Sequence, residues 1–288
     1  MALHIGHTGI TWGIPGDVAQ AYHDVADLGY QGFETFARTI LTWNDQPGGY
    51  QALVAACGIP TVAGYCGKTW IDSATVEADM TAARHEAAAL QAVGGETLVL
   101  ACGRRPPGGC TPAQFRRLAV ALNEIGRFCR DLGLQTGLHP HTGTAIETKE
   151  DIDAIMALLD PEAVGFAPDT GQIAKGGSDL LDVLRTYRTR ITHVHLKDWG
   201  GTYERSIDGK EIDVTGYVNY VPIGLGILPM REILDFLDAM PFAGWVNVEL
   251  DGTPKAPRPP REAALLSRRY LGSVLGDRVL WRNAPPAG

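Results

Sequence analysis

Short apolar runs alternate with longer amphipathic stretches along most of the chain. Runs such as IPTVAGY, ETLVLA and GWVNVEL are nearly continuous in apolar residues, which is typical of parallel strands buried on both faces. Glycine often follows a helical stretch, as in DLGYQGF, because it adopts left-handed dihedral angles at little cost. The pattern predicts strands near residues 3–10, 30–36, 59–65, 96–102, 133–139, 163–169, 191–197 and 244–250.

Stretches with helical periodicity lie between most of these strands. They cover residues 17–29, 75–94, 112–133, 148–159, 179–187, 229–240 and 261–276, with a fainter pattern near 49–57. Eight strands that alternate with helices over this length predict a (β/α)8 TIM barrel of the α/β class. An open doubly wound sheet is the competing arrangement, but the GxGxxG that usually follows its first strand is missing.

The chain of 288 residues is expected to form one domain, residues 1–280, followed by a tail at 281–288. The gap between the seventh and eighth strands is the longest, so residues 199–228 are predicted to form a long loop at the carboxyl-terminal face of the barrel. Loops of this length in a compact domain are usually functional. The proline-rich stretch at 254–260 is interpreted as a stiff linker into the last helix.

Composition narrows the class of protein. Hydrophobic residues make up 45% of the chain, charged residues 20%, and the net charge is −8 with no basic block, which argues against nucleic-acid binding. No apolar run approaches the roughly 18 residues of a membrane span. The N-terminus lacks the features of a signal peptide, and the five cysteines show no CxxC spacing. We therefore expect a soluble cytoplasmic protein with neither a nucleic-acid nor a membrane partner.

Motifs of three other enzyme classes are incomplete or missing. The GKT at 67–69 lacks the first glycine of a phosphate-binding loop, because Val62 stands in its place. The His-Glu pair at 85–86 lacks the second histidine of a zinc protease, because Ala89 stands there. The GxSxG of an α/β-hydrolase does not occur.

Charged and imidazole side chains stand where the predicted strands end, which is where barrel enzymes carry their catalytic groups. These residues are Glu34, His139, His141, Asp169, His193, His195, Lys197, Asp198, Glu249 and Asp251. Each alone has an ordinary explanation, such as a helix cap at Asp169 or a surface ion pair between Lys197 and Asp198.

Together, however, these charges on buried strands would be costly, and one divalent metal would satisfy several at once. Mixed imidazole and carboxylate ligands suit Mn²⁺, Co²⁺, Fe²⁺ or Zn²⁺ better than Ca²⁺. A metal-free acid–base site is the alternative.

The second half of the chain resembles the xylose isomerase-like TIM barrels, the sugar isomerase/epimerase superfamily, and within it the myo-inosose (2-keto-myo-inositol) dehydratases. The resemblance rests on LHPHTGTAIETKEDIDAIMALLDPEAVGFAPDTGQ, RITHVHLKDW and GWVNVEL, and it is strong from about 133 to 270. In that superfamily strands five to eight hold one metal, which implies His139, Asp169, His195 and Glu249 as ligands. His141 is the alternative to His139. Mn²⁺ or Co²⁺ is favoured, with Mg²⁺, Fe²⁺ or Zn²⁺ as alternatives.

The chemistry that the resemblance implies is removal of the proton next to the carbonyl of a keto-sugar or keto-cyclitol, through an enediolate. Loss of a β-hydroxyl would make the protein a dehydratase (a lyase), which is the first expectation. Return of the proton to the other face or to the neighbouring carbon would make it an epimerase or an isomerase. A sugar-binding barrel without turnover is the third reading.

His141, Lys197 and Glu249 are the candidate catalytic residues. A lysine beside a metal is expected to have a lowered pKa, which suits proton transfer. The candidate substrate contacts are Trp12, Glu34, Arg104, Gln172 and Trp199.

In relatives a histidine stands at the position of Gln172 and contacts substrate; glutamine keeps the hydrogen bonding but carries no proton. The expected partner is a small polyol or keto-sugar, and the resemblance also points to a homo-oligomer.

Overall fold

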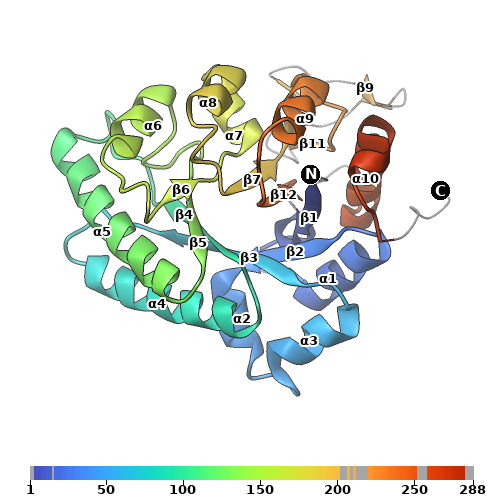
Figure 1. Ribbon diagram of the computed structural model, residues 1–288, viewed down its shortest axis with the longest axis horizontal. Coiled ribbons are helices and arrows are strands. Elements are labelled where there is room, and N and C mark those ends of the chain that lie inside the picture. The colour runs from blue at the N-terminus through green and yellow to red at the C-terminus, as the bar shows by residue number, and fades with distance from the viewer. Residues whose placement is uncertain are drawn as a thin grey trace.

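The computed structural model describes residues 3–14, 16–201, 206–207, 210–211, 220–251 and 258–282. An eight-stranded parallel sheet curls into a ring, in the order β6-β5-β4-β3-β2-β1-β12-β7 (Figure 1). Its strands are β1 (His4–Thr8), β2 (Gly32–Phe36), β3 (Thr61–Lys68), β4 (Thr97–Cys102), β5 (Gln135–His139), β6 (Gly165–Phe166), β7 (His193–Leu196) and β12 (Trp245–Val248). Isolated parallel bridges from Phe166 to Ile191 and from Asp169 to His195 close the ring between β6 and β7. The predicted TIM barrel is therefore confirmed.

Helices surround the ring and connect its strands (Figure 1). They are α1 (Val18–Asp27), α2 (Ala37–Trp43), α3 (Gly49–Cys57), α4 (Val76–Ala92), α5 (Pro112–Asp131), α6 (Lys149–Met156), α7 (Thr170–Lys175), α8 (Leu180–Thr186), α9 (Met230–Asp238) and α10 (Pro260–Leu275), with short 3-10 turns η1 (Gly9–Trp12) and η3 (Gly276–Arg278). Capping boxes at Thr111 and Thr148 begin α5 and α6, because each threonine accepts from a backbone N–H of the first turn.

Three features differ from the expectation. Two short helices were missed, α2 and α7, because each follows its strand directly with too few residues to show periodicity. The third strand runs to Lys68, three residues further than expected. The sixth strand is only two residues long, and Pro168, which follows it closely, has no N–H for the ladder.

The expected loop at 199–228 contains short strands in the part that the structure describes. β8 (Asp198–Trp199) pairs antiparallel with β11 (Tyr220–Val221), and β9 (Ser206–Ile207) pairs with β10 (Lys210–Glu211). Residues 202–205, 208–209 and 212–219 of this loop, 252–257 of the linker and 283–288 of the tail lie outside the described residues. Trp281, at the start of the expected tail, packs against the core with the Arg268 guanidinium 3.4 Å from its ring centroid.

Asp198 anchors the far side of this loop. Its buried carboxylate accepts backbone N–H groups of Gly224 and Gly226, both at 2.9 Å, and of Leu228 at 3.3 Å. Burial raises the pKa of Asp198 to about 6, although these N–H donors act in the opposite direction. The suggested surface ion pair of Lys197 with Asp198 is therefore wrong, because both side chains are buried and Lys197 contacts other carboxylates.

Replacing Asp198 by alanine is expected to destabilise the fold by about 2–5 kcal/mol, because several half-buried backbone N–H groups lose their acceptor at once. Denaturant unfolding measures this, with Asp277→Ala as the control at an exposed acidic residue. Equal unfolding midpoints of the two variants would show that Asp198 does not anchor the loop.

Candidate metal and catalytic site

Four side chains converge inside the carboxyl-terminal end of the barrel. His139 ends β5, Asp169 follows β6 and His195 lies on β7; each offers one ligand atom, and these atoms lie within 4.8 Å of one another. Glu249, directly after β12, places Oε2 3.0 Å from Nδ1 of His195. The residues that the sequence singled out as one ligand set are therefore neighbours, and all four are buried.

Several polar atoms of this group have no hydrogen-bond partner. Both ring nitrogens of His139 are buried without one, and so is Oδ2 of Asp169, although Nζ of Lys197 lies 3.1 Å from it. Burial, reinforced by His195, holds the pKa of His139 well below its usual value, so the ring is neutral. Unpaired buried polar atoms are costly. A divalent cation fits this donor set because neutral imidazole and carboxylate are its ordinary ligands.

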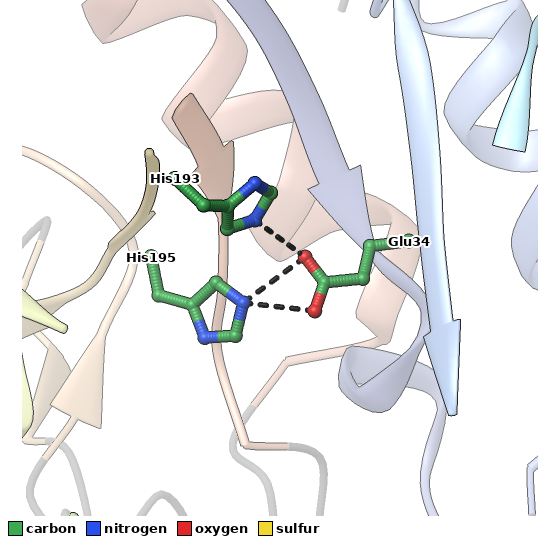
Figure 2. A group of neighbouring side chains, drawn as sticks. All are labelled: Glu34, His193 and His195. Atoms are coloured by element: carbon green, nitrogen blue, oxygen red, sulfur yellow. Dashed lines mark hydrogen bonds and ion pairs between the residues drawn. The ribbon is translucent and has the colours of Figure 1, made fainter. Parts of the chain in front are cut away.

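Glu34 reaches across the barrel from β2 to the two histidines of β7 (Figure 2). Its Oε2 lies 2.9 Å from Nε2 of His193, and its Oε1 lies 2.9 Å from Nε2 of His195. Asn247 on β12 donates to the same carboxylate at 2.7 Å. Since a carboxylate only accepts, Nε2 of His195 carries a proton, while Nδ1 faces Glu249. Burial alone would lower the pKa of His195, but Glu249 and Glu34 outweigh it and hold the pKa well above its usual value.

The charge of Glu34 is stabilised by these contacts. Burial alone would raise the pKa of Glu34, but His195 and His193 outweigh it and hold the pKa far below its usual value. Glu34, His193 and His195 also have ligand atoms close enough for a metal, yet hydrogen bonds already engage both oxygens of the carboxylate. Glu34 was expected to contact substrate, and it does line the cavity described below.

Lys197 lies fully buried among carboxylates. Its Nζ is 2.6 Å from Oε1 of Glu249, 3.1 Å from Oδ2 of Asp169 and 3.4 Å from Asp251. Burial lowers the pKa of Lys197, but the carboxylates outweigh it, and the pKa lies well above its usual value. The expected lowering of the pKa was for a lysine beside a metal ion, and it stays a prediction for that state. Gly171 makes room for the stem, because a Cβ there would lie 2.8 Å from Cγ of Lys197.

Gln172 fixes the orientation of His141. Its Oε1 accepts from the backbone N–H of Thr142 at 3.2 Å and from the Tyr220 hydroxyl at 2.6 Å, so its amide nitrogen faces Nε2 of His141 at 2.8 Å. Nδ1 of His141 donates to the carbonyl of Thr142 at 2.7 Å. The two contacts together fix the orientation of the His141 ring.

A cavity of about 580 Å³ opens beside these groups, and Glu34, Tyr65, His141 and Glu249 form its inner wall. Three expected substrate contacts are not among the described residues that line it. Trp12 donates its indole N–H to Asp24 at 2.9 Å, Trp199 packs in a small apolar cluster, and Arg104 is exposed beyond β4. Gln172 reaches the cavity only through His141.

Sequence reasoning missed two groups of site residues. Asn247 stands two residues before Glu249, so strand alternation places both on one face and could have revealed it. The cavity wall formed by α2, including Thr39 and Trp43, gave no such signal, because that helix was not predicted.

Comparison with known proteins bears on the family and the fold of this chain. The family model described as xylose isomerase-like TIM barrel matches residues 22–271. An inosose dehydratase of Lacticaseibacillus casei is 30% identical over 171 residues, which cover 57% of this chain and 56% of that protein. The chain thus spans about half the length of the curated relatives that it matches.

Two solved structures share the fold. The apo 3-keto-D-glucoside 4-epimerase YcjR from E. coli has a TM-score of 0.67 at 18% identity, covering 94% of this chain and 98% of that one. The IOLI protein with a bound zinc atom has a TM-score of 0.74 at 15% identity, covering 96% and 99%. Within the described residues we find no helix with the length and apolar character that a membrane crossing needs.

Proposed function

The chain belongs to the xylose isomerase-like TIM barrel family, and we propose that it is a metal-dependent enzyme that removes the proton beside the carbonyl of a keto-sugar or keto-cyclitol. The observation that carries the proposal is the buried convergence of His139, Asp169, His195 and Glu249 beside Lys197, at the wall of a cavity. Dehydration is the preferred outcome, because the curated relatives at about 30% identity are named inosose dehydratases.

His139, Asp169, His195 and Glu249 would hold one divalent ion, with Mn²⁺ or Co²⁺ favoured. When bound, this ion would supply Lewis-acid chemistry, polarising the ketone so that the neighbouring C–H becomes more acidic. The similar IOLI structure holds zinc, which supports a divalent ion without choosing among the metals. His141 is the less suitable ligand, because its two ring nitrogens are engaged by Gln172 and Thr142.

Glu249 is the proposed base. Burial would raise the pKa of Glu249, but His195 and Lys197 outweigh it and keep the carboxylate ionised, as a proton acceptor must be. The ammonium of Lys197 is the proposed donor to the departing β-hydroxyl, which leaves as water. His141 is the second candidate for that role, since it lines the same cavity.

Epimerisation or isomerisation is the second candidate function. It needs the same proton removal but returns the proton to the carbon skeleton. The structural likeness to a 3-keto-D-glucoside 4-epimerase supports it as the alternative. A sugar-binding barrel without turnover is disfavoured, because binding alone does not call for a buried lysine among three carboxylates.

Solvent deuterium tests the proposal. Manganese-loaded protein in D2O is expected to exchange a carbon-bound hydrogen of a keto-inositol or a ketose for deuterium. Protein treated with a chelator is expected to lose this activity and to regain it when metal is returned. Mass spectrometry of recovered substrate and product then separates the outcomes, since dehydration also removes 18 mass units of water while epimerisation does not. Absence of exchange with every keto compound and every metal would contradict turnover.

The Glu34→Gln variant is expected to bind metal about 10–100-fold more weakly, because the amide cannot accept from both histidines and His195 loses its orientation. Titration against a chelating dye measures the affinity. Glu86→Gln is the matched control, since Glu86 is a buried carboxylate paired with Lys68 outside the site. Equal metal affinities for the two variants would show that Glu34 does not orient His195 for metal binding.

A further inference from the structure

The cavity extends well beyond the catalytic groups. Its lining includes His141 and Glu249 beside the catalytic groups, and also residues of η1, the start of α1 and the helix α2. Its volume of about 580 Å³ is within the range of about 300–1,000 Å³ in which proteins hold drug-sized ligands. A single six-membered ring seated at the catalytic end would leave the α2 end empty.

The part of the cavity beside α2 is largely apolar. We call it the α2 subsite, lined by Ile10, Ile14, Val18, Phe36 and Trp43 together with the threonines Thr35, Thr39 and Thr42. Ile14 is 56% exposed, an unusual position for isoleucine beside a catalytic cavity. Among the described lining residues Arg38 carries the one positive charge, and its guanidinium lies over the Phe36 ring, 5.4 Å from the centroid.

Such a wall discriminates between ligands. Sugar hydroxyls placed against its apolar side chains would lose water without gaining hydrogen bonds to them, which is unfavourable. An apolar group bound there would instead bury both its own surface and the apolar surface of the cavity wall, which is favourable in proportion to the area buried.

We propose that the α2 subsite binds an apolar, ring-bearing aglycone, so that the substrate is a keto-glycoside and not a free keto-cyclitol. The proposal rests on the proposed function and narrows its substrate class. The ketone-bearing ring lies at Glu249 and His141, and the aglycone extends past Phe36 toward Trp43.

Two inert glycosides test the subsite without turnover. Methyl and phenyl β-D-glucopyranoside carry no ketone and share one sugar, so only the aglycone differs. With manganese-loaded protein, isothermal titration calorimetry is expected to show at least tenfold tighter binding of the phenyl glycoside, equivalent to about 1.4 kcal/mol. Equal affinities, tighter binding of the methyl glycoside, or no binding of the phenyl glycoside would overturn the proposal.

A cavity-filling variant locates the effect. Thr39→Trp fills the subsite from α2, and the phenyl preference is expected to fall to within about twofold, since the ring loses its space. Leu41→Trp is the matched control, because Leu41 is exposed on the same helix and does not line the cavity. A preference that survives in Thr39→Trp would place the aglycone elsewhere.

These titrations separate the two proposals. Phenyl preference without deuterium exchange in any keto compound would keep the subsite and reject turnover. Exchange into a keto-inositol without phenyl preference would keep turnover and reject the subsite.

Discussion

Replacing Asp169 by alanine is expected to empty the metal site and abolish deuterium exchange. Wild-type protein should contain about one Mn, Co, Fe or Zn per chain, and the variant close to none, because a neutral methyl group replaces an anionic ligand atom beside His139 and His195. Exchange should fall by at least about 10³-fold, since Lewis-acid stabilisation of developing charge is worth several kcal/mol. Elemental analysis and mass spectrometry measure the two quantities on the same samples.

Asp169 has a structural role that must be separated from this one. Its Oδ1 accepts the backbone N–H of Gln172 at 2.9 Å and so caps α7, a contact worth about 1 kcal/mol. Asp169→Asn keeps an oxygen for the cap while removing the charge, so it should retain the fold and still lose metal.

Asp251→Ala is the matched control, because this carboxylate also faces Lys197 but lies outside the ligand group. Full metal content in Asp169→Asn, or equal loss in Asp251→Ala, would contradict the assignment.

The sequence was sufficient to predict the barrel because its buried strands are short apolar runs that recur at regular intervals. The sequence was also sufficient to predict that the ligand candidates are neighbours, because the carboxyl ends of all strands in a closed parallel barrel lie at the same end of it. Alternation along β7 correctly placed His193, His195 and Lys197 on one face, since both histidines contact Glu34 and Lys197 contacts Glu249 inside the ring.

Partners of these side chains could not be predicted in the same way. Glu34 and His195 are 161 positions apart in the sequence, and no local pattern predicts which side chain on the other side of the barrel Glu34 will contact. The pKa of Lys197 is the same kind of quantity, because its direction depends on how many carboxylates surround the ammonium. The α2 subsite depends on a seven-residue helix whose periodicity is too short to detect.

The Lys197→Met variant is expected to separate proton removal from loss of the hydroxyl. If Lys197 donates to the departing β-hydroxyl, dehydration should fall by about 10²–10⁴-fold. The rate of deuterium exchange into the substrate should fall much less, because Glu249 still accepts the proton. Methionine keeps most of the buried stem volume, so the change is chiefly the lost ammonium. Rates of both processes, measured on one substrate in D2O, provide the comparison.

Metal content must accompany these rates, because the ammonium also neutralises Asp169 and Glu249. Loss of the positive charge leaves these carboxylates freer to hold a divalent ion, so metal content should be equal to or higher than in wild type. Lys175→Met is the matched control, since both lysines lie over the Tyr220 ring, at 4.9 and 4.6 Å from its centroid, but only Lys197 contacts Glu249. Equal loss of deuterium exchange and dehydration would instead make Lys197 part of the proton-removal step, and unchanged dehydration would leave His141 as the donor.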